Sequence, residues 1–179
     1  MTSHLSHSFH KLERQRRNLL AGVSTWSEAR LRFRPDPSTW SMLDMLDHLL
    51  KVELEILKAI NASLPDGVPV TLKDRFGALM VAGVMLSPMR IKVPGAASEV
   101  LPAATSSLAE IAQKWGSSRL ELLQLLNSLS SSQLRLGLFR HPVAGWMTIA
   151  QTMNFFSVHL THHRHQFARL KQATRTLGI

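Results

Sequence analysis

Four long segments of this chain repeat apolar residues at intervals of three and four, the spacing that places them on one side of an α-helix. Between the segments there is no convincing alternation of apolar and polar residues, the pattern of a half-buried β-strand. Helices with one apolar side are stable when they bury that side against each other. The pattern therefore predicts an all-α protein, a four-helix bundle with helices over about residues 6–30, 39–62, 108–129 and 147–174.

Turn-forming residues separate the predicted helices. Pro35 and Pro37 end the first helix, and Pro65-Asp66-Gly67 follows the second. A shorter apolar piece at 72–86 and a segment at 88–102 with three prolines come next. We expect these two pieces to form a long crossover between the second and third helices of the bundle.

Length and composition narrow the class of protein. At 179 residues, the chain can bury about 70% of its unfolded surface, enough for residues 1–179 to fold as one domain. The absence of cysteine excludes disulfides, thiolate metal sites and thiol nucleophiles, and leaves His, Asp and Glu as strong metal ligands. The longest apolar run, 78–86, is too short to cross a bilayer, and the N-terminus lacks the apolar stretch of a secretory signal. We therefore expect a cytoplasmic protein with no membrane partner.

The formal net charge of +9 raises the question of nucleic-acid binding. However, no basic stretch is interleaved with the aromatic residues on which bases stack, and the chain has no tyrosine. We therefore expect a solvated basic surface and no nucleic-acid partner. The basic residues gather near the two ends of the chain: Arg14, Arg16, Arg17, Arg30, Arg32 and Arg34, then Arg164, Arg169, Lys171 and Arg175.

Two of the nine histidines have the spacing of metal ligands. His159 and His163 are four residues apart in the last predicted helix, so their imidazoles project from the same side, as two ligands of one ion must. His163 also lies in the apolar stripe of this helix, seven residues from both Phe156 and Leu170. Five further histidines fall on polar positions, where we expect them to be exposed: His162, His165 and, in the first turns of the chain, His4, His7 and His10.

A third ligand from another helix is needed to close such a site. The second predicted helix offers Asp44, Asp47, His48 and Glu53, and its broad apolar arc permits His48 without selecting it. Asp44 could bind the ion itself or orient His48 by accepting its second N–H. The competing interpretation is a core histidine whose nitrogens are satisfied by a backbone carbonyl or a buried polar group.

Several short motifs, in order, resemble the DinB/YfiT-like family of metal-binding four-helix bundles. In that family one histidine of the second helix and two of the fourth bind a divalent metal with open positions, and by resemblance these are His48, His159 and His163. One departure is His165, where relatives often have glycine. The matching motifs are Trp40-Ser41 with His48 after it, Lys92-Val93-Pro94, the His141-Pro142…Gly145 turn, and His159-x-x-x-His163 followed by Gln166.

The resemblance implies a nickel or zinc ion, with iron or manganese as further candidates, and a reaction on a small molecule. The two reaction classes that it implies are metal-dependent hydrolysis and transfer of a low-molecular-weight thiol such as bacillithiol or mycothiol. The thiol would have to arrive as a cosubstrate, because the chain has no cysteine. Relatives are often homodimers, for which Met80, Val84 and Met85 could supply an interface or instead pack on the bundle.

Two alternatives remain open at this point. The first is a non-catalytic metal-binding or stress-response protein whose basic surface binds a polyanion, and strong salt dependence of binding would favour it. The second is a redox or oxygen-sensing iron site, although a mixed histidine and carboxylate ligand set is the more usual one for that chemistry.

Overall fold

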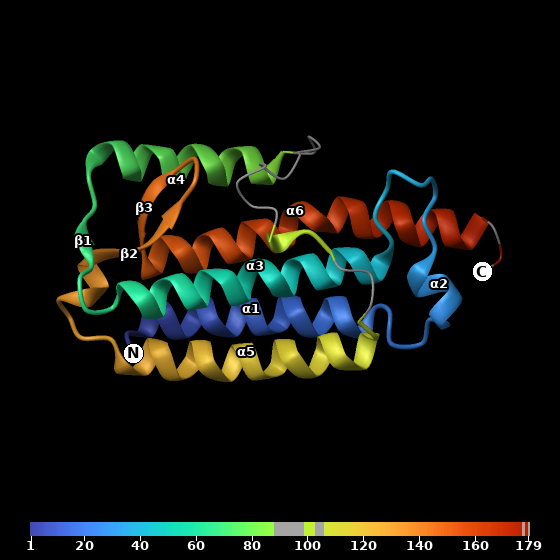
Figure 1. Cartoon of the computed structure of the whole chain (residues 1–179), viewed down its shortest axis with the longest axis horizontal. Coiled ribbons are helices and arrows are strands. Elements are labelled where there is room, and N and C mark those ends of the chain that lie inside the picture. The colour runs from blue at the N-terminus through green and yellow to red at the C-terminus, as the bar shows by residue number, and fades with distance from the viewer. Residues whose placement is uncertain (88–98, 103–105, 177, 179) are drawn as a thin grey trace.

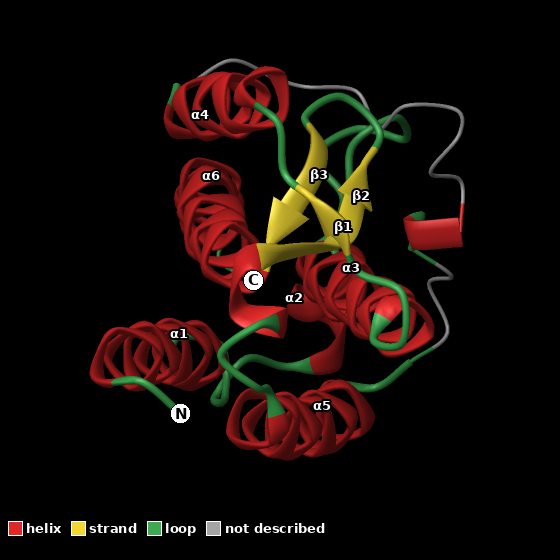
Figure 2. Ribbon diagram, turned by 90° about the vertical axis from the view of Figure 1, so that its left-hand side faces the viewer, coloured by secondary structure: helices red, strands yellow, loops and turns green. Residues whose placement is uncertain are grey.

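Four long helices lie side by side and form the body of the molecule (Figure 1). The computed structural model describes residues 1–87, 99–102, 106–176 and 178. In the end-on view of Figure 2 the helices stand at the corners of a bundle in which α1 contacts α5 and α6, and α3 contacts the same two helices. This confirms the predicted all-α four-helix bundle. The four helices are α1 (Ser3–Ala21), α3 (Met42–Ser63), α5 (Leu108–Ser128) and α6 (Ile149–Thr176).

Capping residues in the sequence fix where two of these helices begin. Ser41 precedes α3, accepts a hydrogen bond from the backbone N–H of Asp44, and donates its own N–H to the Asp44 carboxylate. Ser107 and Glu110 make the same reciprocal pair at the start of α5. Each capping box satisfies two donors that a helix start would otherwise leave unpaired.

The first predicted helix, 6–30, is two helices. Helix α1 ends at Ala21, the chain turns at Gly22, and a short helix α2 (Glu28–Arg32) follows, capped by Ser27. The turn brings Trp26 onto the C-terminal half of α6, where its ring stacks on Phe167 with centroids 6.4 Å apart. The apolar periodicity continued across the break because both pieces pack on the same bundle, so the period alone did not reveal the turn.

A small antiparallel sheet and one further helix lie on one side of the bundle (Figure 2). The strands pair in the order β1-β2-β3, and helix α4 (Leu72–Leu86) contacts both β3 and α6. These strands were not expected from the sequence, because they are short and β2 does not alternate between buried and exposed positions. The strands are β1 (Val68–Pro69), β2 (Leu136–His141, after a 3₁₀ turn at Gln133–Arg135) and β3 (Gly145–Thr148).

The crossover between α3 and α5 is described in part. Its first piece, predicted as apolar residues 72–86, is helix α4. Residues 99–102 are also described, whereas the Lys92-Val93-Pro94 motif lies outside the described residues. No helix in the described part of the chain is both long and apolar enough to span a membrane.

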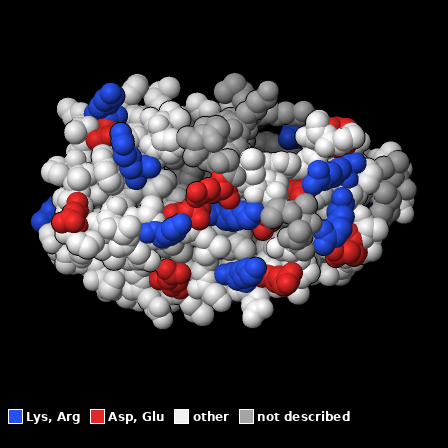
Figure 3. All heavy atoms as spheres, in the orientation of Figure 1, with Lys and Arg blue, Asp and Glu red and all other residues white. Residues whose placement is uncertain are grey.

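Acidic and basic side chains are interspersed over the face seen in Figure 3. Several of the N-terminal arginines have carboxylate partners: Arg16 pairs with Glu13 at 3.0 Å, and Arg34 pairs with Asp44 at 2.8 Å. Arg30 instead lies over the ring of Trp26, 4.0 Å from its centroid. These arginines are thus held by interactions within the fold, in addition to facing solvent.

Candidate metal centre

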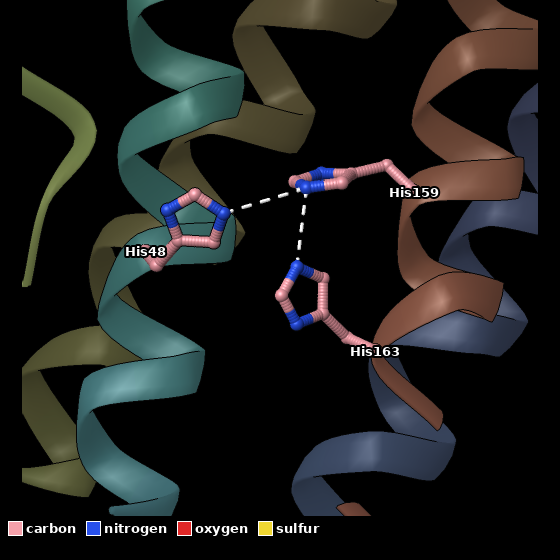
Figure 4. Close-up of side chains that lie close together, drawn as sticks. All are labelled: His48, His159 and His163. Carbon is pink, nitrogen blue, oxygen red and sulfur yellow. Dashed lines mark hydrogen bonds between the residues drawn. The ribbon is translucent and has the colours of Figure 1, made fainter. Parts of the chain in front are cut away.

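Three histidines from two helices point toward one another in the middle of the bundle (Figure 4). His48 comes from α3, and His159 and His163 come from α6. The Nε2 atom of His159 lies 3.4 Å from Nε2 of His48 and 3.2 Å from Nε2 of His163. All three side chains are buried, with exposed fractions of 4%, 7% and 7% for His48, His159 and His163.

Helix geometry explains how the sequence produces this convergence. The spacing of four residues puts His159 and His163 one turn apart on the side of α6 that faces α3. On α3, every residue from 41 to 50 is buried, so this half of the helix has no exposed side. An apolar arc could therefore not decide the orientation of His48, whose side chain points toward α6.

Hydrogen bonds that the outer ring nitrogens donate fix the tautomers of two of these histidines. Nδ1 of His48 lies 2.8 Å from the backbone carbonyl of Val100, and Nδ1 of His163 lies 3.0 Å from Oε1 of Gln166. Because a carbonyl oxygen only accepts, each Nδ1 carries the proton and donates it. The lone pair of each Nε2 is left facing the centre of the cluster, which is the arrangement that metal-bound histidines adopt.

Burial keeps the three imidazoles neutral. It lowers the pKa of His48, lowers that of His163 to about 3, and lowers that of His159 well below its usual value. For His159 and His163 the nearby imidazoles add to this effect, because a charge on one ring disfavours a charge on the next. At neutral pH the site therefore offers unprotonated nitrogens, the form in which histidine binds a metal.

The two Nε2 separations from His159 fit a small cation. A zinc–nitrogen bond of about 2.0–2.1 Å in a tetrahedral site implies about 3.3 Å between neighbouring ligand nitrogens. The Nε2 atom of His159 lies 3.2 Å from that of His163 and 3.4 Å from that of His48, close to this value, and all three ligand atoms lie within 4.8 Å of one another. A single proton could bridge one pair of nitrogens, whereas one cation can satisfy all three lone pairs at once.

Aromatic rings hold the imidazoles in place from outside. Trp40 stacks on His163 with an interplanar angle of 7°, and its centroid lies 4.8 Å from that of His48. Phe155 stacks on His159 with centroids 5.5 Å apart. These contacts restrict rotation of the rings and exclude water from their backs.

A pocket of about 1370 Å³ opens next to the cluster. All three histidines line it, so a molecule in the pocket can reach the convergent nitrogens. Most of the remaining wall is apolar, which is usual for a small-molecule site. Residues along this wall include Trp40, Val52, Met80, Val84, Phe139 and Phe155.

The carboxylates considered as third ligands are engaged elsewhere. Asp44 caps α3 through Ser41 and pairs with Arg34, so the partner of His48 Nδ1 is the Val100 carbonyl and not Asp44. The other two carboxylates, of Asp47 and Glu53, form ion pairs with Lys51 at 3.1 Å and Arg119 at 2.8 Å.

The remaining histidines fall in three environments. His4, His7, His10 and His165 are exposed, as expected. His162 is half-buried instead of exposed, because its Nδ1 donates to the Met85 carbonyl, 3.1 Å away. His141 also lines the pocket, although nothing in its spacing indicated this, since it reaches the pocket from the hairpin between β2 and β3.

Comparison with known proteins places this geometry in a wider group. A family model described as the DinB superfamily matches residues 11–167. Among solved structures, YfiT from Bacillus subtilis, described as a probable metal-dependent hydrolase with an unusual four-helix bundle topology, matches with a TM-score of 0.67. The match covers 99% of this chain and 90% of that chain at 17% sequence identity, a level at which the likeness concerns the fold. No functionally curated protein matches the sequence significantly.

Proposed function

Because the chain belongs to the DinB superfamily, we propose that it is a metal-dependent enzyme that acts on a small molecule. In this proposal His48, His159 and His163 bind one divalent cation, and the pocket beside them receives the substrate. The observation that carries the proposal is the convergence of three neutral Nε2 atoms in a buried site that opens onto that pocket. Such a ligand set suits nickel or zinc.

A bound divalent cation would supply a nucleophile, since it lowers the pKa of a coordinated water or thiol toward neutrality. The chain's own residues orient the metal ligands and restrict the access of water. The Val100 carbonyl and the Gln166 amide oxygen keep the protons of His48 and His163 on the outer nitrogens. Trp40 and Phe155 fix the ring planes, and the apolar wall limits the access of water to the reacting groups.

Transfer of a low-molecular-weight thiol is the reaction that the size of the pocket favours. Pockets for one small ligand usually occupy about 300–1,000 Å³. The volume of about 1370 Å³ leaves room for two molecules, a thiol and the acceptor that it attacks. Metal-dependent hydrolysis, in which water replaces the thiol, is the second candidate, and the description of YfiT as a probable metal-dependent hydrolase supports it.

Metal content and turnover test the proposal. The purified protein should carry close to one equivalent of a divalent transition metal by elemental analysis. The metal-loaded protein should then be incubated with an electrophilic acceptor, with and without bacillithiol, mycothiol or glutathione, and separately with ester and amide substrates. Thiol-dependent turnover supports the transferase, and turnover of esters or amides without thiol supports the hydrolase. Retained metal without any turnover would instead favour a non-catalytic metal-binding protein.

We further propose that the protein is a homodimer that associates through the outer side of α4. After the charged first turn, residues 76–86 of this helix are all apolar, and a helix that is apolar on every side is normally buried on every side. Contiguous exposed apolar patches of more than a few hundred Å² mark interaction sites. An apolar stripe runs along the outer side of α4, and we call it the α4 face. It consists of Gly83 and four large exposed side chains: Leu72 (84% exposed), Phe76 (65%), Leu79 (69%) and Leu86 (56%).

A second copy of the chain fits this surface because the stripe complements itself. Residues 72, 76, 79, 83 and 86 alternate steps of four and three, the repeat by which two helices pack along a common seam. A Cβ atom on Gly83 would meet nothing within 4 Å, so the backbone is open to close approach there. The three residues that the resemblance indicated for this role, Met80, Val84 and Met85, line the pocket instead.

A further inference from the structure

His141 lies at the end of β2 with one ring nitrogen fully committed to its own turn. The backbone N–H groups of Val143 and Ala144 both donate to Nδ1 of His141, each at 3.1 Å. A nitrogen that accepts hydrogen bonds carries no proton, so in the neutral ring the proton is on Nε2. The turn thus selects the Nε2–H tautomer of His141.

Contacts with α4 hold this turn in place. His141 pairs with Gly145 across the hairpin, and Gly145 has φ of 80°, a conformation that favours glycine. The next backbone N–H, of Trp146, donates to Oδ1 of Asp74 at the start of α4, 3.0 Å away. A Cβ on Gly77 of α4 would lie only 2.5 Å from the carbonyl oxygen of Ala144, so the two backbones touch. The imidazole is therefore presented from a fixed support.

The ring of His141 forms part of the pocket wall close to the histidine cluster. It packs edge-on against Phe155 with centroids 5.1 Å apart, and Phe155 in turn stacks on His159. One aromatic ring therefore separates His141 from a proposed metal ligand. Within the described part of the chain, Nε2 of His141 has no hydrogen-bond partner, although the residue is half-buried.

We propose that His141 is a specificity-determining residue whose Nε2–H donates a hydrogen bond to a carbonyl or carboxylate oxygen of the substrate. This inference rests on the proposed function, because the reacting end of the same substrate lies at His48, His159 and His163. The substrate class is a molecule with a largely apolar body and an oxygen acceptor about one aromatic ring away from its reacting group.

The chemistry of the ring and its neighbours defines this class. Burial lowers the pKa of His141 to about 4, so the ring remains a neutral donor near pH 7. A neutral donor does not require an anionic partner, and an uncharged carbonyl is sufficient. The neighbouring rings of Phe139 and Phe155 favour an apolar or aromatic body next to the acceptor.

Two substitutions separate this role from the structural role of the turn. In His141→Asn the amide oxygen lies about where Nδ1 lies, so it can accept the two backbone N–H groups and preserve the turn. In His141→Gln the amide nitrogen lies about where Nε2 lies, so it preserves the donor to the pocket. If His141 acts only as a cap, the asparagine variant should resemble the wild type in every measurement.

The test uses the zinc-loaded protein and three probes: benzohydroxamate, which chelates the metal, and its 3-acetyl and 4-acetyl derivatives, which add a carbonyl acceptor. Isothermal titration calorimetry gives the dissociation constants. We expect one acetyl derivative to bind wild type about fivefold more tightly than the parent, as one hydrogen bond provides. This gain should disappear in His141→Asn, return in part in His141→Gln, and leave benzohydroxamate binding within twofold in all three proteins.

A second measurement does not depend on metal. Long-range ¹⁵N correlation spectra of the metal-free protein should show His141 as the Nε2–H tautomer between pH 6 and 8. An Nδ1–H tautomer, or an acetyl gain that is absent or is the same in wild type and His141→Asn, would overturn this inference while leaving the metal site standing. Failure of the wild type to retain zinc or bind benzohydroxamate would instead contradict the proposed function on which the inference rests.

Discussion

His48 and His159 bring their Nε2 atoms to within 3.4 Å of each other although 111 residues separate them in the sequence. Their helices contact each other through the core, and both rings are buried. Two neutral nitrogens with lone pairs directed at one point gain nothing from their proximity unless a proton or a cation lies between them. This relationship is the reason to expect that metal binding and stability are linked in this protein.

We predict that replacing one histidine of the cluster removes the metal. His163→Ala should reduce the bound metal from about one equivalent to less than about one tenth, because two imidazoles leave a site incomplete. Elemental analysis after dialysis measures this directly. His165→Ala is the matched control, since His165 lies two residues away on the same helix and is exposed. Equal metal content in the two variants would contradict the assignment of His163 as a ligand.

Removal of the metal should destabilise the fold. A ligand present at one hundred times its dissociation constant stabilises the state that binds it by about 2.7 kcal/mol. Treatment with a chelator should therefore lower the thermal midpoint of the wild type by several degrees, and metal should restore it. The same treatment should leave the midpoint of His163→Ala unchanged. A wild-type midpoint that does not respond to metal at saturating concentration would show that folding and metal binding are independent.

The long helices could be predicted from the sequence, and the small sheet could not. Apolar residues at intervals of three and four report burial on one side of a helix, and this information is local. The pairing of β1 with β2 joins Val68 to Gly137, far apart in the chain, and the register of β2 with β3 shifts between Gly137 and Phe139. Neither β1 nor β2 has an alternating pattern of apolar and polar residues that would predict such pairing.

The candidate site, too, could be predicted from the sequence only in part. The spacing of His159 and His163 could be interpreted from helix geometry alone. The orientation of His48 could not be predicted in this way, because residues 41–50 are buried on all sides. Its role as a ligand came from the family resemblance instead. The groups that orient these rings, such as the Val100 carbonyl and Trp40, come from connecting segments. The positions of such segments depend on the assembled fold, so no local pattern reveals them.

Acid should destabilise the wild type through His141. Its pKa falls from about 6.5 in the unfolded chain to about 4 in the folded protein, because burial disfavours the charged ring. The unfolded state thus binds more protons between these values, and stability falls as pH decreases from 6.5 to 4. In His141→Asn this contribution is absent. Urea midpoints of the two metal-free proteins, measured from pH 7.5 to 4.5, should therefore show a shallower decline for the variant, and parallel curves would contradict the assignment.

The α4 face predicts a dimer that one charge can break. The chain has a mass of 20.0 kDa, so sedimentation of the wild type should give about twice this value. Leu79→Glu places a charge in the middle of the stripe and should yield a monomer, since burying an unpaired carboxylate is costly. Leu120→Glu is the matched control, because Leu120 is 64% exposed on α5, outside the stripe.

The absence of cysteine allows a positive test of the same interface. Gly83→Cys introduces the only thiol of the chain, at the point where two α4 helices would approach most closely. Mild oxidation should convert most of this variant to a disulfide-linked dimer, whereas a cysteine introduced at Leu120 should remain free. A wild type that sediments as a monomer at micromolar concentration would contradict the dimer.

The last prediction concerns the carboxylate that the sequence offered as a third ligand and that the fold uses elsewhere. Glu53 is 2% exposed and pairs with Arg119, also 2% exposed, at 2.8 Å. Trp115 and Ser118 donate further hydrogen bonds to the same carboxylate, at 2.9 and 2.7 Å. Arg119→Met would leave this charge buried with no cation beside it, which costs about 3–5 kcal/mol in comparable cases.

Urea unfolding of the metal-free variant measures the loss. Lys58→Met, which breaks the exposed pair with Glu55, should cost less than about 1 kcal/mol. If both variants lose the same stability, the buried pair is not what holds α5 against α3, and the apolar contacts around Trp115 would have to account for it.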